Sequence, residues 1–400
     1  LRGHKNRKQL LTSFTGCRRS VSDLFAEEVL SSQSKAVRDF LLKTSILDQL
    51  CPELCDQLIG NDNARQLLNH IEASSLFLVQ LDDERNWYRY HHLFAEFLQQ
   101  RLNAHYPHAE ERLYMQASHW CWNAGQYDES IEYALRGKNP QRAADLLELR
   151  CQDMTYSGKF RLVNKFVAQI PKEIIRQLPR VQLTLAWLAT RSLRFNETRQ
   201  LLTHVADIIQ QRAHSQQADE NEISQLRYLM CHREMMLAAA EDDAPRVEEQ
   251  CRFLLDEFPK ERHPYLCGTI YAQLLYARRE QYKLNDVEQL QAMAQGILGR
   301  SEYSFASIAL QASIGPSLFF AGRTDAATRA LEQGLEQGIR YGGMNSSLAA
   351  LPALPLAEIL YESNQLDRAL SFIEGTLNYA PEMGFIDQLM AGYLTLSRIR

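Results

Sequence analysis

One pattern recurs along most of this 400-residue sequence: a helical stretch ends at Gly or Asn, a short polar step leads to Asp, and small or apolar residues return at helical spacing. Small residues in the second stretch let two helices approach closely, as stacked helix pairs require. We expect roughly seven such pairs between residues 106 and 380, about 38 to 42 residues apart. The pattern predicts a mainly α-helical solenoid of the tetratricopeptide (TPR) type. Its copies are NAGQYDESIEYALRG (123–137), FAGRTDAATRALEQG (320–334), YESNQLDRALSFIEG (361–375) and the weaker SLRFNETRQLLTHV (192–205).

A different pattern precedes these pairs. AVRDFLLKTSIL, CPELCDQLIG and NARQLLNHIEAS have the spacing of three short helices, the second of which ends at Gly60. LFLVQL (76–81) and WYRYH (87–91) are typical of two strands joined by the polar turn DDERN, and HLFAEFLQQRL then resumes helical spacing. Helices followed by a two-stranded ribbon predict a small winged-helix domain. Its core is expected to contain Val37, Phe40, Leu41, Ile46, Leu93, Phe94, Phe97, Leu98 and Leu102.

Composition restricts the classes of function. The formal net charge is -5, and neither half of the chain is basic enough to bind nucleic acid through charge alone. The eight cysteines show no CxxC spacing, which indicates free thiols in a reducing compartment. No apolar run reaches about 18 residues, so we expect a cytoplasmic protein without a membrane partner. Because the chain starts without Met and ends within a helical pattern, we expect it to be a piece of a larger protein.

Three segments carry a family resemblance: SFTGCRRSVSDLFAEEVLSSQ (13–33), VRDFLLKTSILDQLCPELCDQLIG (37–60) and LFLVQLDDERNWYRYHHLFAEFLQQRL (76–102). In this order and spacing they resemble the large ATP-dependent regulators of the maltose-regulon-activator (MalT-like) class, which belong to the signal-transducing ATPases with numerous domains (STAND). The resemblance implies that residues 1–35 end the ATPase helical subdomain, 36–105 form the winged-helix domain, and 106–400 form a TPR-like sensor superhelix.

The resemblance also implies properties of the parent protein: a slow ATPase switch that binds ATP or ADP, self-association in the active state, and DNA binding through a C-terminal LuxR-type helix-turn-helix. This sequence has no GxxxxGK[ST] loop and shows no such C-terminal motif. We therefore expect no cofactor in this chain. We also expect no enzymatic activity, catalytic residue or metal ligand, since GxSxG and HExxH are absent and HYPH (105–108) lacks a third ligand.

His91 in YHHLF is the candidate for nucleotide contact, a role that the resemblance implies. An imidazole beside a helix N-terminus can donate a hydrogen bond to a phosphate, and the helix end adds positive potential. The alternative is that His91 and His92 cap the following helix and pack under the wing. We interpret His92 as structural.

Aromatic and hydrogen-bonding side chains also share several of the expected first helices, which line the groove of a TPR-like superhelix. Such surfaces suit a small polar effector, although Tyr and Trp at helical spacing also fill the seams between repeats. Two functions follow: an arm that binds a small inducer and relays it through the winged helix to the nucleotide state, or a scaffold that holds an inhibitory protein partner. The candidate effector-binding residues are Trp187, Arg191, Arg227, Tyr228, His232, Tyr271, Tyr276 and Gln311.

Overall fold

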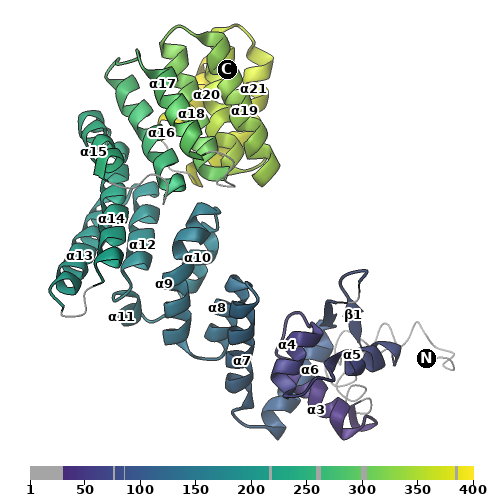
Figure 1. Ribbon diagram of the computed structural model, residues 1–400. Coiled ribbons are helices and arrows are strands. Elements are labelled where there is room, and N and C mark those ends of the chain that lie inside the picture. Colours follow the sequence, from purple (N-terminus) through teal and green to yellow (C-terminus); the bar gives the residue numbers. More distant parts are fainter. Residues whose placement is uncertain are drawn as a thin grey trace. The chain divides into compact units, whose positions relative to one another are not determined.

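The computed structural model describes residues 30–74, 77–84, 86–215, 219–257, 263–298, 304–382 and 386–400. The segment expected to end an ATPase subdomain, residues 1–35, therefore lies mostly outside the described residues. The chain divides into two compact units: one extends to Leu146 and includes residues 169–171, and the other holds residues 147–168 and 172–400. Figure 1 shows that helices make up nearly all of both units.

The first unit contains the expected short helices and the two-stranded ribbon. The Ser34 side chain accepts a hydrogen bond from the N–H of Val37 and so starts α3. Gly60, with φ of 77°, ends α4 in the left-handed conformation that glycine adopts without strain. The elements are α3 (Lys35–Thr44), α4 (Pro52–Ile59), α5 (Ala64–Ala73), β1 (Leu78–Gln80), β2 (Tyr88–Tyr90), α6 (His92–His105), α7 (Ala109–Asn123) and α8 (Tyr127–Arg136).

The wing is an antiparallel pair in which Leu78 lies opposite Tyr90 and Gln80 opposite Tyr88. A single carboxylate organises its turn, because Asp82 Oδ1 accepts hydrogen bonds from the N–H groups of Asn86 at 2.9 Å and Trp87 at 3.0 Å. The pair is tied to the helices by the Tyr90 hydroxyl, which lies 2.8 Å from Thr44 Oγ1. This contact fixes the strand that leads into α6.

The core of this unit confirms the expected pattern with one exception. Leu93 was expected to face inward, but its side chain is 50% exposed. It lies in the first turn of α6, and helical side chains lean toward the N-terminus, which carries this one past the end of the core. The buried members are Val37, Phe40, Leu41, Ile46, Phe94, Phe97, Leu98 and Leu102.

The first helix pair packs with the winged helix. The Tyr133 hydroxyl of α8 accepts a hydrogen bond from the Asp48 N–H at 3.2 Å, and Arg136 donates to the Asp48 carboxylate at 2.9 Å. Tyr114 and Tyr133 stack with ring centroids 6.0 Å apart. The repeat pattern thus begins within the first compact unit.

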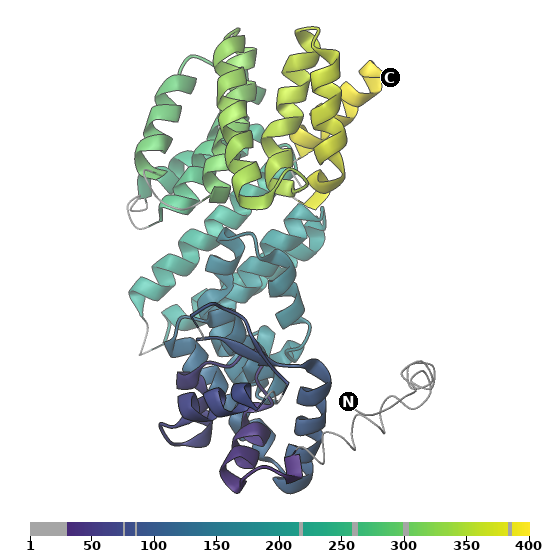
Figure 2. The same ribbon diagram turned by 90° about the vertical axis from the view of Figure 1, so that its right-hand side faces the viewer.

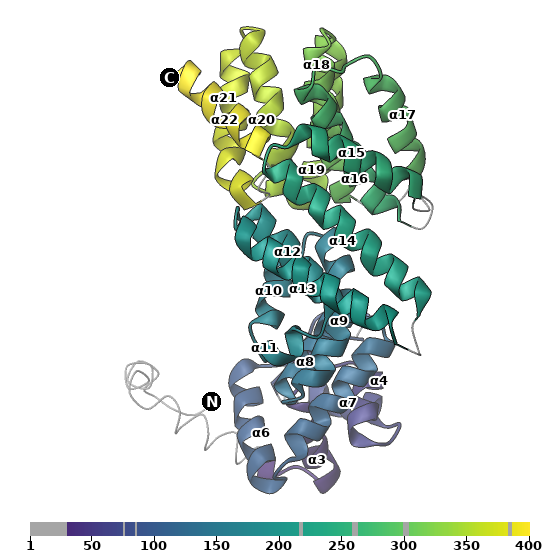
Figure 3. The same ribbon diagram turned by 90° about the vertical axis from the view of Figure 1, so that its left-hand side faces the viewer.

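Helix pairs continue from α9, which begins in the first unit, and the described residues of the second unit contain no strand. Figures 2 and 3 show these helices from opposite sides. Together with α7 and α8, the pairs begin about 40 residues apart, which confirms a TPR-like repeat body. The elements are α9 (Pro140–Tyr156), α10 (Phe160–Val167), α11 (Lys172–Ile175), α12 (Pro179–Arg191), α13 (Phe195–Ala213), α14 (Glu220–Ala240), α15 (Ala244–Glu257), α16 (Pro264–Glu280), α17 (Val287–Leu298), α18 (Ser304–Phe320), α19 (Thr324–Gly342), α20 (Ser347–Glu362), α21 (Leu366–Thr376), η3 (Leu377–Glu382) and α22 (Ile386–Ile399).

Small residues set the spacing between neighbouring helices, as the sequence predicted. A Cβ atom at Gly338 of α19 would lie 2.7 Å from the carbonyl oxygen of Leu348 and 2.9 Å from Cα of Ala349, both in α20. Backbone cannot yield to such a contact as a side-chain tip can. Glycine at this position therefore lets the two helices meet at backbone distance.

Candidate functional site

The first helices of successive pairs face a common cavity of about 270 Å³ in the second unit. Its walls come from α12, α14, α16, α18 and the start of α22. For α22 to reach residues of α12 and α16, the array of first helices must curve around the cavity. The cavity is therefore on the concave face of the repeats, where the sequence placed the effector groove.

One wall combines an indole with a guanidinium. Trp187 and Arg191 lie one turn apart on α12, and the guanidinium carbon of Arg191 is 4.0 Å from the ring centroid of Phe160 and 6.0 Å from that of Trp187. Arg233 lies against the same indole, with its guanidinium carbon 5.3 Å from the ring centroid. These stacked contacts hold the indole at the cavity edge.

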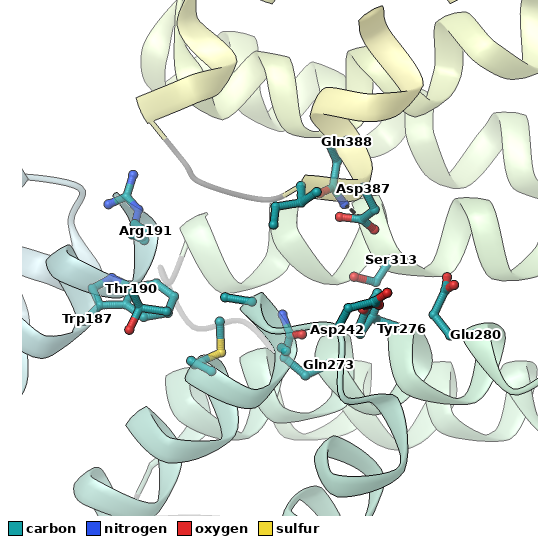
Figure 4. Close-up of a pocket in the computed structure, with 14 residues that line it drawn as sticks. Trp187, Thr190, Arg191, Asp242, Gln273, Tyr276, Glu280, Ser313, Asp387 and Gln388 are labelled. Carbon is teal, nitrogen blue, oxygen red and sulfur yellow. Dashed lines mark hydrogen bonds between the residues drawn. The ribbon is translucent and has the colours of Figure 1, made fainter. Parts of the chain in front are cut away.

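The facing wall is acidic. Figure 4 shows Arg191 and Trp187 on one side of the cavity and Asp242, Tyr276 and Glu280 on the other. The Tyr276 hydroxyl donates to Asp242 Oδ1 at 2.6 Å, and burial together with this bond raises the pKa of the phenol. The hydrogen bond holds both groups at the cavity surface.

A buried arginine next to the acidic wall connects α16 to α22. Arg279 is 5% exposed, and its Nη2 donates to Asp387 Oδ2 at 3.1 Å and lies 2.9 Å from Glu280 Oε1. The paired carboxylates raise the pKa of Arg279 against the opposing effect of burial. The pairing brings the N-terminal end of α22 to the acidic wall.

The predicted effector residues separate into three groups. Trp187, Arg191 and Tyr276 line the cavity. Arg227 is exposed and is not among the lining residues. The others are buried among the helices, as the packing alternative describes: Tyr228, His232, Tyr271 and Gln311.

His232 belongs to a buried polar chain behind the Trp187 wall. Arg233 Nη1 lies 3.0 Å from His232 Nδ1, and an arginine can only donate, so Nδ1 accepts. The proton is then on Nε2, which donates to Thr269 Oγ1 at 2.8 Å. Burial, and then the Arg233 charge, lower the pKa of this imidazole well below its usual value. The neutral ring holds α14 against α16.

A second cavity, of about 430 Å³, lies in the winged-helix unit. Arg89, His91 and His92 line it together with Asp48 and Glu96. The rings of His91 and His92 are 4.4 Å apart between centroids, and His91 makes no side-chain hydrogen bond that caps α6. His91 is the N-cap residue of α6 through its backbone carbonyl, which accepts from the N–H groups of Phe94 and Ala95, and a nucleotide contact by its side chain stays a prediction.

Sequence reasoning did not identify Arg89. Alternate residues of a strand face the same side, so the spacing of Arg89 and His91 in YRYH is the signal that could have found it. No comparable local signal marks Asp242, Glu280, Asp387 or Gln388, which meet only through the folded superhelix.

Within the described part of the chain, no group of three or more His, Cys, Asp or Glu residues could hold a metal ion. Burial raises the pKa of the Cys51 thiol to about 11 and that of Cys121 to about 12, so these thiols are protonated at neutral pH. None of the described helices has the length and apolar character needed to span a membrane.

The fold thus joins a small winged helix to a TPR-like repeat body. Residues 26–110 match the family described as the MalT winged helix domain. A STAND protein with a tetratricopeptide repeat sensor from Pyrococcus horikoshii is similar in fold, with a TM-score of 0.51 at 15% identity over 93% of this chain and 55% of that one. Together these matches confirm the predicted fold class and the resemblance of the winged-helix segment.

Two curated relatives extend the comparison. Serine/threonine-protein kinase PknK of Mycobacterium tuberculosis (strain ATCC 25618 / H37Rv) is 27% identical over 416 residues, which cover 100% of this chain and 35% of that protein. HTH-type transcriptional regulator MalT of Yersinia pestis (strain Pestoides F) is 30% identical over 192 residues, 48% of this chain and 21% of that protein. The chain thus spans 35% or less of the length of each relative.

Proposed function

We propose that this chain is the effector-sensing arm of an ATP-dependent bacterial transcriptional activator of the MalT-like class. The observation that carries the proposal is the cavity on the concave face of the repeats, where Trp187, Arg191 and Tyr276 meet residues of α22. A small inducer bound there contacts helices that are far apart in the sequence. The inducer therefore stabilises the arrangement of the repeats in which it can contact all of these helices at once.

The relay requires differential affinity. An inducer shifts the resting form toward the active form only by as much as it binds the active form more tightly. The resting form would be the one in which the parent holds ADP. The parent would exchange ADP for ATP, self-associate and bind DNA through a C-terminal domain beyond this chain. A segment that matches this whole chain also occurs in PknK, by its name a kinase, which supports an arm whose role is separate from any one kind of output domain.

The winged-helix cavity supports a role in this relay. His91 projects beside the start of α6, and Arg89 lines the same cavity. Two donors of this kind next to a helix N-terminus suit the phosphates of a nucleotide held mainly by the parent's ATPase module. We assign the nucleotide contact to His91, with Arg89 as a second donor.

The test is calorimetry of the purified chain against sugars, polyols, ketols, organic acids and amines. A micromolar ligand is expected, and Ala240→Leu should abolish its binding, because Ala240 lines the cavity and the leucine side chain would intrude into it without removing a hydrogen bond. Ala213→Leu, the same change at the exposed end of α13, is the matched control.

Two outcomes would count against the proposal. Silence across the whole panel would favour a scaffold that holds an inhibitory protein partner. A ligand whose affinity survives Ala240→Leu would bind elsewhere, and the cavity would lose its assigned role.

A further inference from the structure

The chemistry of the cavity wall restricts what it can bind. Gln388 of α22 is 5% exposed, and its Nε2 donates to Asp387 Oδ2 at 3.2 Å. Because a carboxylate only accepts, the amide nitrogen must face Asp387, and Oε1 is the atom that remains. Oε1 is buried without a hydrogen-bond partner, while the residue lines the cavity beside Asp387 (Figure 4).

A buried acceptor without a partner destabilises the unliganded form, so a ligand that donates a hydrogen bond to it gains affinity. Carboxylates share the cavity with it, while the one cationic residue among the described lining residues, Arg191, is on the opposite side with Trp187 (Figure 4). Asp242, Glu280 and Asp387 line the same cavity, and the buried cation Arg279 is shared between Glu280 and Asp387. The Tyr276 hydroxyl satisfies one oxygen of Asp242 and leaves the other available.

The arrangement discriminates among ligand classes. An inorganic anion would be repelled by the carboxylates and would leave Oε1 without a donor. A neutral polyol could donate to Oε1 but would gain nothing from the negative charge. A protonated amine supplies three N–H donors and a positive charge in one group.

We propose that the effector carries a protonated primary amine, which donates to Gln388 Oε1 and lies between the carboxylates of Asp242 and Asp387. The carbon skeleton of the effector extends toward Trp187 and Met236, which line the same cavity. This inference rests on the proposed function, namely that the cavity is an effector site.

The experiment compares isosteric pairs by calorimetry on the full chain: putrescine against 1,4-butanediol, and cadaverine against 1,5-pentanediol. Each amine is expected to bind at least about tenfold more tightly than its diol, with an affinity that falls at high salt because the contact is ionic. The diol keeps the chain length and the donor, so the difference measures the charge.

Two variants locate the contact. Asp242→Asn keeps an acceptor for Tyr276, and Asn suits the φ of 60° at this position, so the fold is preserved while the charge is removed. Gln388→Met keeps the volume and removes the acceptor. Each should weaken the binding of putrescine about tenfold, as expected for the loss of one charge-assisted hydrogen bond. Asp207→Asn on the exposed face of α13 is the matched control and should leave binding unchanged.

The outcomes separate the two proposals. If diols or sugars bind and amines do not, the amine inference fails and the effector site stands, provided that Ala240→Leu still abolishes binding. Amine binding that is unaffected by Asp242→Asn and Gln388→Met would be nonspecific and would overturn the inference. If neither amines nor diols bind, the amine inference fails, and the effector site fails as well only if the sugars, ketols and organic acids are also silent.

Discussion

The two cavities differ in the way the chain builds them. The winged-helix cavity takes Arg89, His91 and His92 from one short stretch and adds the carboxylates of Asp48 and Glu96, whereas the repeat cavity takes its carboxylates from segments more than a hundred residues apart. We propose that Arg89 and His91 of the first contact a phosphate, and that the carboxylates of the second hold an ammonium group. If both proposals hold, the chain binds two ligands of opposite charge at separate sites, and the two ligands do not compete.

The largest expected effect concerns the close packing of the repeats, on which only the second cavity depends. Gly338→Ala should lower the free energy of unfolding by about 3 kcal/mol, in the range of overpacking, because its Cβ would meet the backbone of α20. Urea denaturation followed by circular dichroism measures the loss. Gly296→Ala on α17 is the matched control: a Cβ there meets nothing within 4 Å, so it should stabilise by about 0.5 to 1 kcal/mol. Equal effects of the two changes would contradict the close approach of α19 and α20.

A smaller effect concerns pH and the buried His232. Its pKa in the folded chain is lowered, so below about pH 6.5 the unfolded chain takes up a proton that the folded chain refuses. The stability present at neutral pH should therefore fall as pH drops, by up to about 1.4 kcal/mol per pH unit. His232→Gln should flatten this slope, measured by urea denaturation at pH 7.5, 6.0 and 5.0. The same change at the exposed His214 should leave the slope in place; a flattening there as well would remove His232 as its source.

The smallest expected effect is at the winged-helix cavity. Pyrophosphate should bind the isolated chain only weakly, at about 1 mM, because most of a nucleotide pocket would be supplied by the parent. Titration followed by histidine NMR should shift the signals of His91 before those of His214. Arg89→Gln should reduce the shift about twofold to threefold, as for one exposed charge contact. Putrescine that moved the His91 signals as strongly as pyrophosphate would remove the contrast between the cavities.

Much of the fold follows from local pattern. The alternation in WYRYH and the polar DDERN define the wing, and the small residues of the repeats predict helix pairs. Both patterns can be recognised because each repeats within a short stretch of sequence. The misplacement of Leu93 shows the limit: periodicity assigns a face of a helix but does not say where the core ends along its length.

The repeat cavity was predictable only in part. Trp187, Arg191 and Tyr276 share first helices, so helical spacing identified them as candidates. Spacing could not separate them from Tyr228 and Tyr271, which have the same residue type but fill the seams between helices. Asp387 and Gln388 carry no local signal at all, because their approach to α16 depends on the curvature of the repeats that separate them in the sequence.

The pairing of Arg279 with Asp387 has a consequence for unfolding. In a linear repeat array each pair depends only on its neighbours, so the terminal pair can fray at little cost. Here the start of α22 is tied to a helix three pairs earlier. The helices from α16 to α22 cannot separate one at a time without breaking that ion pair. The repeats between α16 and α22 should therefore open together as one cooperative segment.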